Sequence, residues 1–185
     1  MGELRDEGRD QLIRLAGGDD GVALLALQQR LDRQSAYMLV EPDERDTTPD
    51  RLRERLAGRS AHGAFDLVAD EPDAPSGSVQ RLVGWLAVEV LPYRRAAHVG
   101  YVVLGVDRSY AGRGIGAALM DACVDEATRR GLRRLELTVM TDNLRAMGLY
   151  LRHGFEVEGL RRQAVLRSGE LVDEYYMARL LDQRA

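Results

Sequence analysis

The chain has 185 residues and a formal net charge of -4, with 45% hydrophobic and 30% charged residues, which suits a single globular domain. The acidic balance excludes a globally basic surface for nucleic acid, and no apolar run approaches the roughly 18–20 residues that span a membrane. One cysteine, Cys123, excludes an intrachain disulfide; its apolar neighbours in a predicted helix indicate a core thiol.

The beginning of the chain is polar and lacks the apolar core of a signal peptide, so we expect a cytoplasmic protein. We expect residues 1–185 to form a single domain, with about residues 1–10 disordered.

The first half of the chain predicts one short strand, two helices and two further strands. Residues 11–16 are semi-apolar, and Asp19-Asp20 then precede apolar residues at helical spacing, which predicts a helix to about Arg33. Thr48-Pro49 begins a second helix that continues to about Leu56, because a cap residue followed by proline favours a helix start. Residues 64–68 and 82–91 are strand-like, and between them lies a proline-containing loop at residues 70–78.

The second half alternates strands with helices. Residues 99–106 are apolar on both faces, as in a central strand, and residues 115–130 have helical spacing that ends at Gly131. A strand at residues 135–140, a helix at 143–152 and two strands at 155–165 and 171–181 follow. The order β-α-α-β-β-β-α-β-α-β-β predicts an α+β fold: a mixed, mostly antiparallel sheet with helices on both faces, an α/β/α sandwich.

A glycine-rich loop at residues 107–117 joins the predicted central strand to the helix that follows it. Gly112, Gly114 and Gly116 allow backbone N–H groups to close on an anion, and the helix start adds unpaired donors. A pyrophosphate is the natural ligand. Residues 112–117 also match the dinucleotide pattern G-x-G-x-x-A, although the expected acidic residue about 20 positions later is not convincing. A tight turn without a ligand is the third alternative.

A second motif lies about 30 residues after the loop, in the helix predicted at residues 143–152. Asn143, Ala146 and Tyr150 fall on one face of that helix, and Ala146 is small enough for a ligand to approach. Gly154 and Phe155 then end the helix and begin the next strand.

The two motifs together resemble those of the Gcn5-related N-acetyltransferase (GNAT) family, over about residues 11–181. Residues 135–143 and 169–177 are similar to those of bacterial GNAT proteins of the RimJ/RimL-like kind. The chain departs from the family pattern at Ala111, where the phosphate loop usually begins with Gln or Arg.

The resemblance implies a GNAT fold, in which a sheet of about seven strands splays between its fourth and fifth strands and acetyl-CoA, the co-substrate, lies in the opening. It implies that the backbone of Leu104, Gly105 and Val106 pairs with the pantetheine arm, and that Asn143 and Ala146 lie near the cofactor. The pyrophosphate would be held by the loop residues Ala111, Gly112, Arg113, Gly114, Ile115, Gly116 and Ala117.

The implied activity is N-acetyl transfer to a small-molecule or peptide amine, with Tyr150 as the general acid that protonates the leaving thiolate. Some relatives carry a glutamate base on the fourth strand, but no carboxylate lies near Gly100-Tyr101. The candidate bases are Glu41, Glu89, His98 and Asp107, and Glu41 is preferred because it lies in the segment that covers the acceptor site in similar proteins.

The alternative function is a CoA-binding sensor without turnover, which the departure at Ala111 keeps open. His62, His98 and His153 share no metal-ligand spacing, so we expect no metal. The acceptor and the oligomeric state stay open, although dimers are common among similar proteins.

Overall fold

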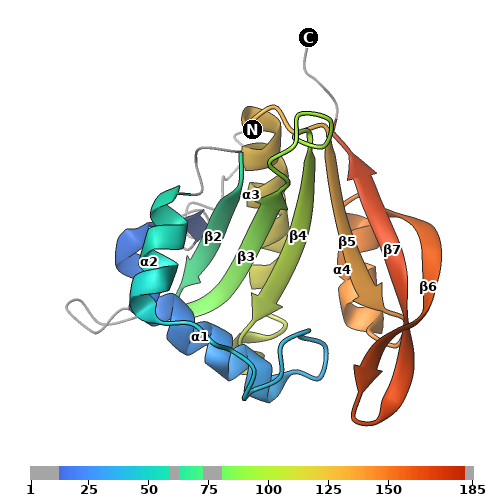
Figure 1. Cartoon of the computed structure of the whole chain (residues 1–185), viewed down its shortest axis with the longest axis horizontal. Coiled ribbons are helices and arrows are strands. Elements are labelled where there is room, and N and C mark those ends of the chain that lie inside the picture. The colour runs from blue at the N-terminus through green and yellow to red at the C-terminus, as the bar shows by residue number, and fades with distance from the viewer. Residues whose placement is uncertain (1–12, 59–62, 73–80, 182–185) are drawn as a thin grey trace, which may run out of the picture.

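The computed structural model describes residues 13–58, 63–72 and 81–181. Every strand and helix that the sequence predicts is present in the predicted order, with bounds that differ by one or two residues (Figure 1). The disorder expected at about residues 1–10, the first two residues of the predicted first strand and much of the loop expected at residues 70–78 lie outside the described residues. The elements are β1 (Ile13–Leu15), η1 (Gly18–Asp20), α1 (Gly21–Gln34), α2 (Pro49–Gly58), β2 (Phe65–Asp70), β3 (Leu82–Val90), β4 (Val99–Val106), η3 (Arg108–Tyr110), α3 (Ile115–Arg129), β5 (Arg134–Met140), α4 (Leu144–Arg152), β6 (Glu156–Arg167) and β7 (Glu170–Leu180).

The strands form one sheet of seven in the order β1-β2-β3-β4-β5-β7-β6. Every neighbouring pair is antiparallel except β4 and β5, which are parallel. The predicted mixed, mostly antiparallel sheet is therefore confirmed.

The two parallel strands pair at only one end. Their register runs from Val99 opposite Arg134 to Tyr101 opposite Glu136, and beyond Tyr101 the strands diverge (Figure 1). β4 stays paired with β3 as far as Val106, and β5 stays paired with β7 as far as Met140. The sheet is consequently split into two intact halves with a wedge between them, which is the splay that the resemblance implied.

Two hydrophobic cores form on opposite faces of the sheet, because successive strand residues point to opposite sides. On the face in front in Figure 1, Leu24 and Leu27 of α1 pack with Val68 and Trp85 of the sheet. On the other face, the buried residues of α3 and α4 form a larger core with the opposite side chains of the strands. The helices thus cover both faces, as the sequence predicted.

Cys123 of α3 lies in this larger core and is fully buried. Burial raises the pKa of its thiol to about 12, despite the nearby charge of Arg179, so the thiol stays protonated at neutral pH. The expectation of a core thiol is confirmed, and a nucleophilic role is disfavoured.

Candidate functional site

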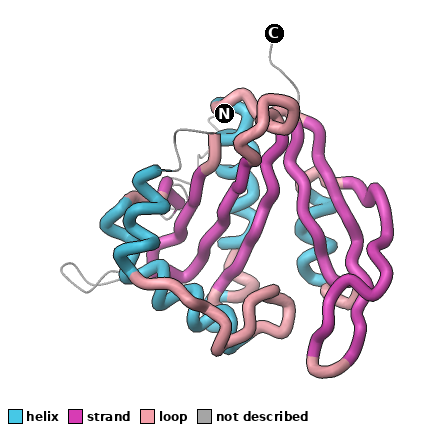
Figure 2. Tube along the Cα trace, viewed as in Figure 1, coloured by secondary structure: helices cyan, strands magenta, loops and turns pink. Residues whose placement is uncertain are grey.

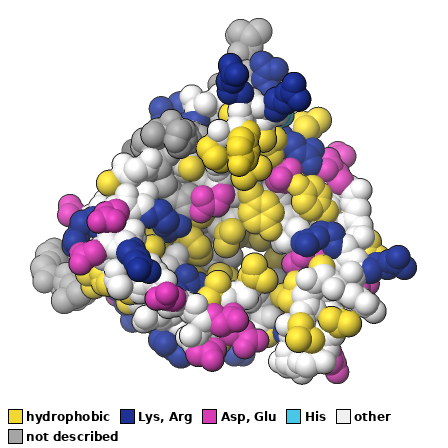
Figure 3. Space-filling model, viewed as in Figure 1, with side chains coloured by type: hydrophobic (Ala, Val, Ile, Leu, Met, Phe, Trp, Pro, Cys, Tyr) yellow, Lys and Arg dark blue, Asp and Glu magenta, His cyan; other side chains and the backbone are white. Residues whose placement is uncertain are grey.

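A cavity of about 1040 Å³ occupies the wedge between β4 and β5. Figure 3, viewed as in Figure 1, shows the corresponding hollow near the middle of the molecule, with hydrophobic side chains around it. The segment that joins α1 to α2, residues 35–48, runs beneath the open end of the wedge (Figures 1 and 2). We call this space the interstrand cavity.

One wall of the interstrand cavity is β4, from Tyr101 to Val106. Leu104, Gly105 and Val106, which the resemblance put beside the cofactor, all line it. A Cβ at Gly105 would lie 2.5 Å from Cδ1 of Leu31, so glycine allows α1 to pack directly on this strand. The β4 edge that faces β5 has no β5 partner after Tyr101, which leaves backbone groups available to a ligand.

The glycine loop forms the floor of the cavity beside the first turn of α3. Gly112 and Gly114 have φ of +83° and +84° and open space where a side chain would be, so conformation rather than crowding requires glycine there. Gly114 is also the N-cap residue of α3, a helix of 15 residues. Unpaired N–H groups of this first turn therefore face a cavity, as in anion sites at helix starts. The residues of this region that line the cavity are Ala111, Gly112, Gly114, Ile115, Gly116 and Ala117.

Between Ala111 and Ala117, Arg113 is the residue that does not line the cavity. Its guanidinium lies over the ring of Tyr110, 4.9 Å from the centroid, and Arg81 lies 5.8 Å from the same centroid. The Tyr110 hydroxyl donates a hydrogen bond to Glu71 in the loop after β2. These contacts anchor the loop from outside, in a chain where Ala111 cannot provide the longer side chain of the family pattern.

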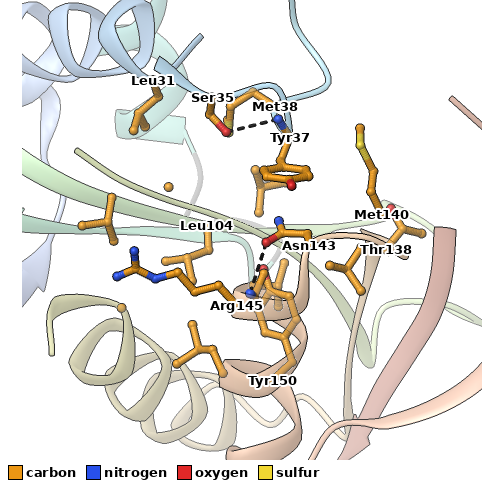
Figure 4. Close-up of a pocket in the computed structure, with 18 of the residues that line it drawn as sticks. Leu31, Ser35, Tyr37, Met38, Leu104, Thr138, Met140, Asn143, Arg145 and Tyr150 are labelled. Carbon is orange, nitrogen blue, oxygen red and sulfur yellow. Dashed lines mark hydrogen bonds between the residues drawn. The ribbon is translucent and has the colours of Figure 1, made fainter. Parts of the chain in front are cut away.

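Helix α4 brings Asn143, Ala146 and Tyr150, which the sequence placed on one helix face, to the cavity lining. The Asn143 side-chain oxygen accepts a hydrogen bond of 3.2 Å from the Ala146 N–H, so Asn143 is also the N-cap of α4 (Figure 4). Its side chain therefore has a structural role in addition to any contact with a ligand.

Tyr150 is 8% exposed and packs against Phe155, with 5.9 Å between the ring centroids. Burial, with a smaller effect of the nearby Tyr101 phenol, raises the pKa of Tyr150 to about 12. No residue in the described part of the chain hydrogen-bonds to its hydroxyl. Tyr150 is thus a protonated phenol at neutral pH whose donor is unused.

Two hydroxyl groups meet where the wedge closes, a pair that no sequence pattern indicated. The Tyr101 hydroxyl of β4 and the Thr138 hydroxyl of β5 are 2.9 Å apart, and both residues line the cavity. Their contact joins the two halves of the sheet, from the last paired residue of β4 to a residue of β5 just beyond the pairing.

The segment beneath the wedge contributes Tyr37, Met38 and Leu39 to the cavity lining. Arg167 of β6 lies over the Tyr37 ring, 5.4 Å from its centroid, and pairs with Asp142 through two bonds of 2.6 and 3.1 Å. This contact connects the α1–α2 segment to the far half of the sheet. The cavity is therefore bridged at its open end as well as at its closed end.

Glu41, which the sequence put forward as the base, is not among the residues that line the cavity. It is exposed, and a turn just after Met38 and Leu39 carries it away, with its backbone N–H donating to Glu44 at 3.0 Å. Arg45 holds the end of this turn against α1 by pairing with the buried Asp32. The structure thus brings neighbouring residues into the cavity but not Glu41 itself.

The other three candidate bases also lie outside the cavity lining. Glu89 and His98 are exposed. Asp107 is fully buried: burial acts to raise its pKa, but hydrogen bonds from the Ser109 N–H, Arg30 and Gln34 outweigh it and lower the pKa. Asp107 is thus a permanently ionised cap of η3.

Two charged residues in the cavity lining were missed at the sequence level, Glu174 of β7 and Arg161 of β6. Glu174 is 8% exposed, and Arg161 Nη1 donates to its Oε2 at 2.6 Å. The register between β5 and β7 is what would have located Glu174. It sets Glu174 opposite Met140 at the end of β5, which borders the wedge. Three further arginines, Arg108, Arg145 and Arg152, line the cavity near the glycine loop and α4.

Within residues 13–58, 63–72 and 81–181, no group of three His, Cys, Asp or Glu residues is placed to hold a metal ion. In the same part of the chain, no helix is long and apolar enough to cross a membrane.

Comparison with known proteins matches residues 29–155 to the family described as "Acetyltransferase (GNAT) family". The chain is 41% identical over 130 residues to the L-amino acid N-acetyltransferase AaaT of Escherichia coli (strain K12), covering 69% of this chain and 74% of that protein. The structure is similar to that of a GNAT-family acetyltransferase of Streptococcus pneumoniae, with a TM-score of 0.84 and 25% identity over 92% of this chain and 99% of that one. It also has the fold of yncA of Salmonella typhimurium, described as a structure with its cofactor acetyl-CoA (TM-score 0.79, 21% identity, 94% and 95% coverage). These matches do not distinguish the RimJ/RimL-like subtype, which stays a prediction.

Proposed function

Since this chain belongs to the acetyltransferase (GNAT) family and is an N-acetyltransferase, we propose that its interstrand cavity transfers the acetyl group of acetyl-CoA to a primary amine of a small molecule or peptide. One observation carries the proposal: a strand with a free edge, a helix-start anion site and a buried phenol with an unused donor line the same cavity.

The cofactor lies with its pyrophosphate on the amides of the glycine loop and the first turn of α3. Gly112 and Gly114 leave room for this approach, and the helix dipole favours the negative charge. The exposed arginines Arg108, Arg145 and Arg152 add positive charge near the phosphates. The pantetheine arm occupies the free edge of β4 at Leu104, Gly105 and Val106, where its amides replace the missing β5 pairing.

The acceptor amine attacks from the other side of the wedge. Its nitrogen lone pair forms a bond to the thioester carbonyl carbon, and the C–S bond breaks as the acetyl group moves to nitrogen. Tyr150 gives its phenolic proton to the departing thiolate, so CoA leaves as a thiol. The proton that the new amide nitrogen loses restores the phenol through solvent, which closes the proton balance.

The proposed reaction leaves the chemical class of the acceptor amine to be decided. The E. coli relative is named an L-amino acid N-acetyltransferase, so amino acids come first among the candidate acceptors, followed by amines without a carboxylate and peptide N-termini. This order is a proposal for the chain described here.

Acetyl-CoA binding and acetyl transfer are tested separately. Calorimetry with CoA and acetyl-CoA measures binding, and thiol release in the presence of an amine panel measures turnover. The chain contains no lysine, so acetylation of its own lysines cannot contribute to the signal. We expect binding and amine-dependent thiol release; binding without release from any amine would instead favour the CoA-binding sensor.

A further inference from the structure

Building on the acetyl transfer proposed above, we propose that Glu174 and Arg161 form the acceptor subsite, and that the acceptor is an α-amino acid in its zwitterionic form. Its ammonium group binds Glu174, its carboxylate binds Arg161, and Glu174 accepts the proton that the ammonium must lose before attack.

Glu174 is positioned to meet a cationic group inside the cavity. It lies opposite Met140, the last residue of β5, and is 8% exposed. One carboxylate oxygen, Oε2, accepts a bond of 2.6 Å from Arg161. The other, Oε1, has no hydrogen-bond partner among the residues that the structure describes. A buried carboxylate with an unused oxygen is a strong acceptor for an ammonium N–H.

Arg161 has further N–H donors that can bind an anionic group. Its side chain is 52% exposed and lines the cavity, and only Nη1 is engaged by Glu174. A guanidinium carries five N–H donors in a planar fork that matches a carboxylate. The pair therefore presents one negative and one positive partner side by side, as the ammonium and carboxylate of an amino acid require.

Other charged side chains that line the cavity are bound to other residues or point away from the proposed subsite. Asp142, the other carboxylate in the described lining, is bound by Arg167 through both oxygens. Arg145 extends from α4 toward Leu104, away from Thr138 and Met140 (Figure 4). The cavity is thus divided into a phosphate end and an acceptor end, and apolar residues around the latter can receive an amino-acid side chain: Met38, Leu39, Met140, Ala164 and Val165.

The two positions that border the pairing of β4 and β5 carry hydroxyls, Tyr101 and Thr138, which bond each other. Hydroxyl groups are weak bases, so the proposed proton acceptor is the Glu174 carboxylate on the neighbouring strand β7. In the proposed step the acceptor ammonium transfers one N–H proton to Glu174, and the neutral nitrogen then attacks the thioester carbon. Glu174 passes its proton to water at the cavity mouth and returns to a carboxylate.

The test compares three acceptors that differ in one group: an L-amino acid, its amide, and the amine that lacks the carboxylate. We expect the wild-type protein to prefer the free amino acid. Glu174→Gln should lower kcat/KM for the amino acid about 100-fold or more, while the KM for acetyl-CoA changes less than about 2-fold. Arg161→Gln should lower kcat/KM about 10-fold or more for the free amino acid only, which removes the preference over the amide.

Matched variants separate this role from a folding effect. Glu170→Gln changes an exposed carboxylate on the same strand, and Arg162→Gln changes the exposed neighbour of Arg161; both should behave as wild type. Glu174→Asp keeps the charge and should recover part of the lost activity. Thermal unfolding and CoA binding are measured for every variant, so a misfolded variant is recognised directly.

Two outcomes overturn the subsite while leaving acetyl transfer intact. The first is a Glu174→Gln variant with normal kcat/KM, especially if Glu41→Gln shows the loss instead. The second is a wild-type protein that acetylates the carboxylate-free amine as well as the amino acid. If the wild-type protein binds acetyl-CoA but acetylates no member of the panel, the transfer itself is wrong and the subsite falls with it.

Discussion

Replacement of Tyr150 by phenylalanine removes one hydroxyl and leaves the ring in place. The ring is 8% exposed and packs on Phe155, while its hydroxyl bonds to no residue in the described part of the chain. No partner is left unsatisfied, so the stability at neutral pH should change by less than about 0.5 kcal/mol. Turnover should fall about 100- to 10,000-fold, the usual effect of losing a general acid. Binding of acetyl-CoA should stay within about 2-fold of wild type.

The pH dependence of the wild-type rate follows from the pKa of Tyr150. Burial raises this pKa to about 12, against about 10 for an exposed tyrosine. Ionisation of this phenol is therefore about 2–3 kcal/mol harder in the folded protein than in an exposed tyrosine. The acid is therefore present below about pH 12, and the wild-type rate should show no fall near pH 10 from loss of this proton.

The raised pKa also makes stability depend on pH. As pH rises through about 10, the unfolded chain releases the Tyr150 proton before the folded protein does, so the folded state loses stability until about pH 12. The phenylalanine variant has no such proton. It should be more stable than wild type by about 1 kcal/mol at pH 11 and by about 2 kcal/mol at pH 12, whereas the two are equal at pH 7.

The assays are single-turnover acetyl transfer at saturating acetyl-CoA and urea unfolding at pH 7 and pH 11. Tyr93→Phe, which alters a ring that is 67% exposed, is the control for nonspecific effects of removing a tyrosine hydroxyl. Normal turnover in Tyr150→Phe would remove the residue from catalysis. An equal loss of stability at high pH in both Tyr150→Phe and wild type would contradict the buried, protonated phenol.

Three further substitutions test the supports of the cavity. Gly114→Ala forces a φ of +84° on a residue with a side chain, so we expect a loss of stability of about 1–2 kcal/mol. Calorimetry should also show weaker acetyl-CoA binding, and unchanged binding would argue against the anion site. Gly105→Ala places a Cβ 2.5 Å from Leu31, so urea unfolding should show a loss of about 1–3 kcal/mol, which Leu31→Ala in the same chain should partly relieve. Asn143→Ala removes the cap of α4 and should cost about 1 kcal/mol, whereas Asn143→Asp should not; equal melting temperatures for the two variants would refute the capping role.

The fold could be predicted from the sequence because its signals are local. Helical spacing, strand alternation and turn residues predicted every strand and α-helix to within two residues, but not the short 3-10 helices η1 and η3. Gly131 has the left-handed φ of +78° expected after a helix. The glycine loop was equally visible, since the strand, the turn and the helix start follow each other along the chain. Local patterns did not fix the splay between β4 and β5, which came from the resemblance alone.

The acceptor side of the cavity depends on contacts between distant residues. Glu174 reaches the wedge only because β7 pairs with β5 in a register that sets it opposite Met140. Nearness along the chain did not predict which residues of the α1–α2 segment reach the cavity either. Met38 and Leu39 line it, whereas Glu41 is carried away by a turn. An irregular segment has no period from which the direction of a side chain can be predicted.

The split sheet suggests how the two substrates are brought together. On the proposed assignment, β4 and the glycine loop hold acetyl-CoA largely through backbone groups, whereas Tyr150 and Glu174 belong to the half formed by β5, β7 and α4. The distance between the thioester and these side chains then depends on how the halves are fixed. Among the contacts of the described residues that join the two sides of the wedge are Tyr101 with Thr138 at the closed end and Tyr37 with Arg167 at the open end. Loosening either contact should therefore affect kcat more than the KM for acetyl-CoA, because it moves the reacting groups apart without altering the phosphate loop.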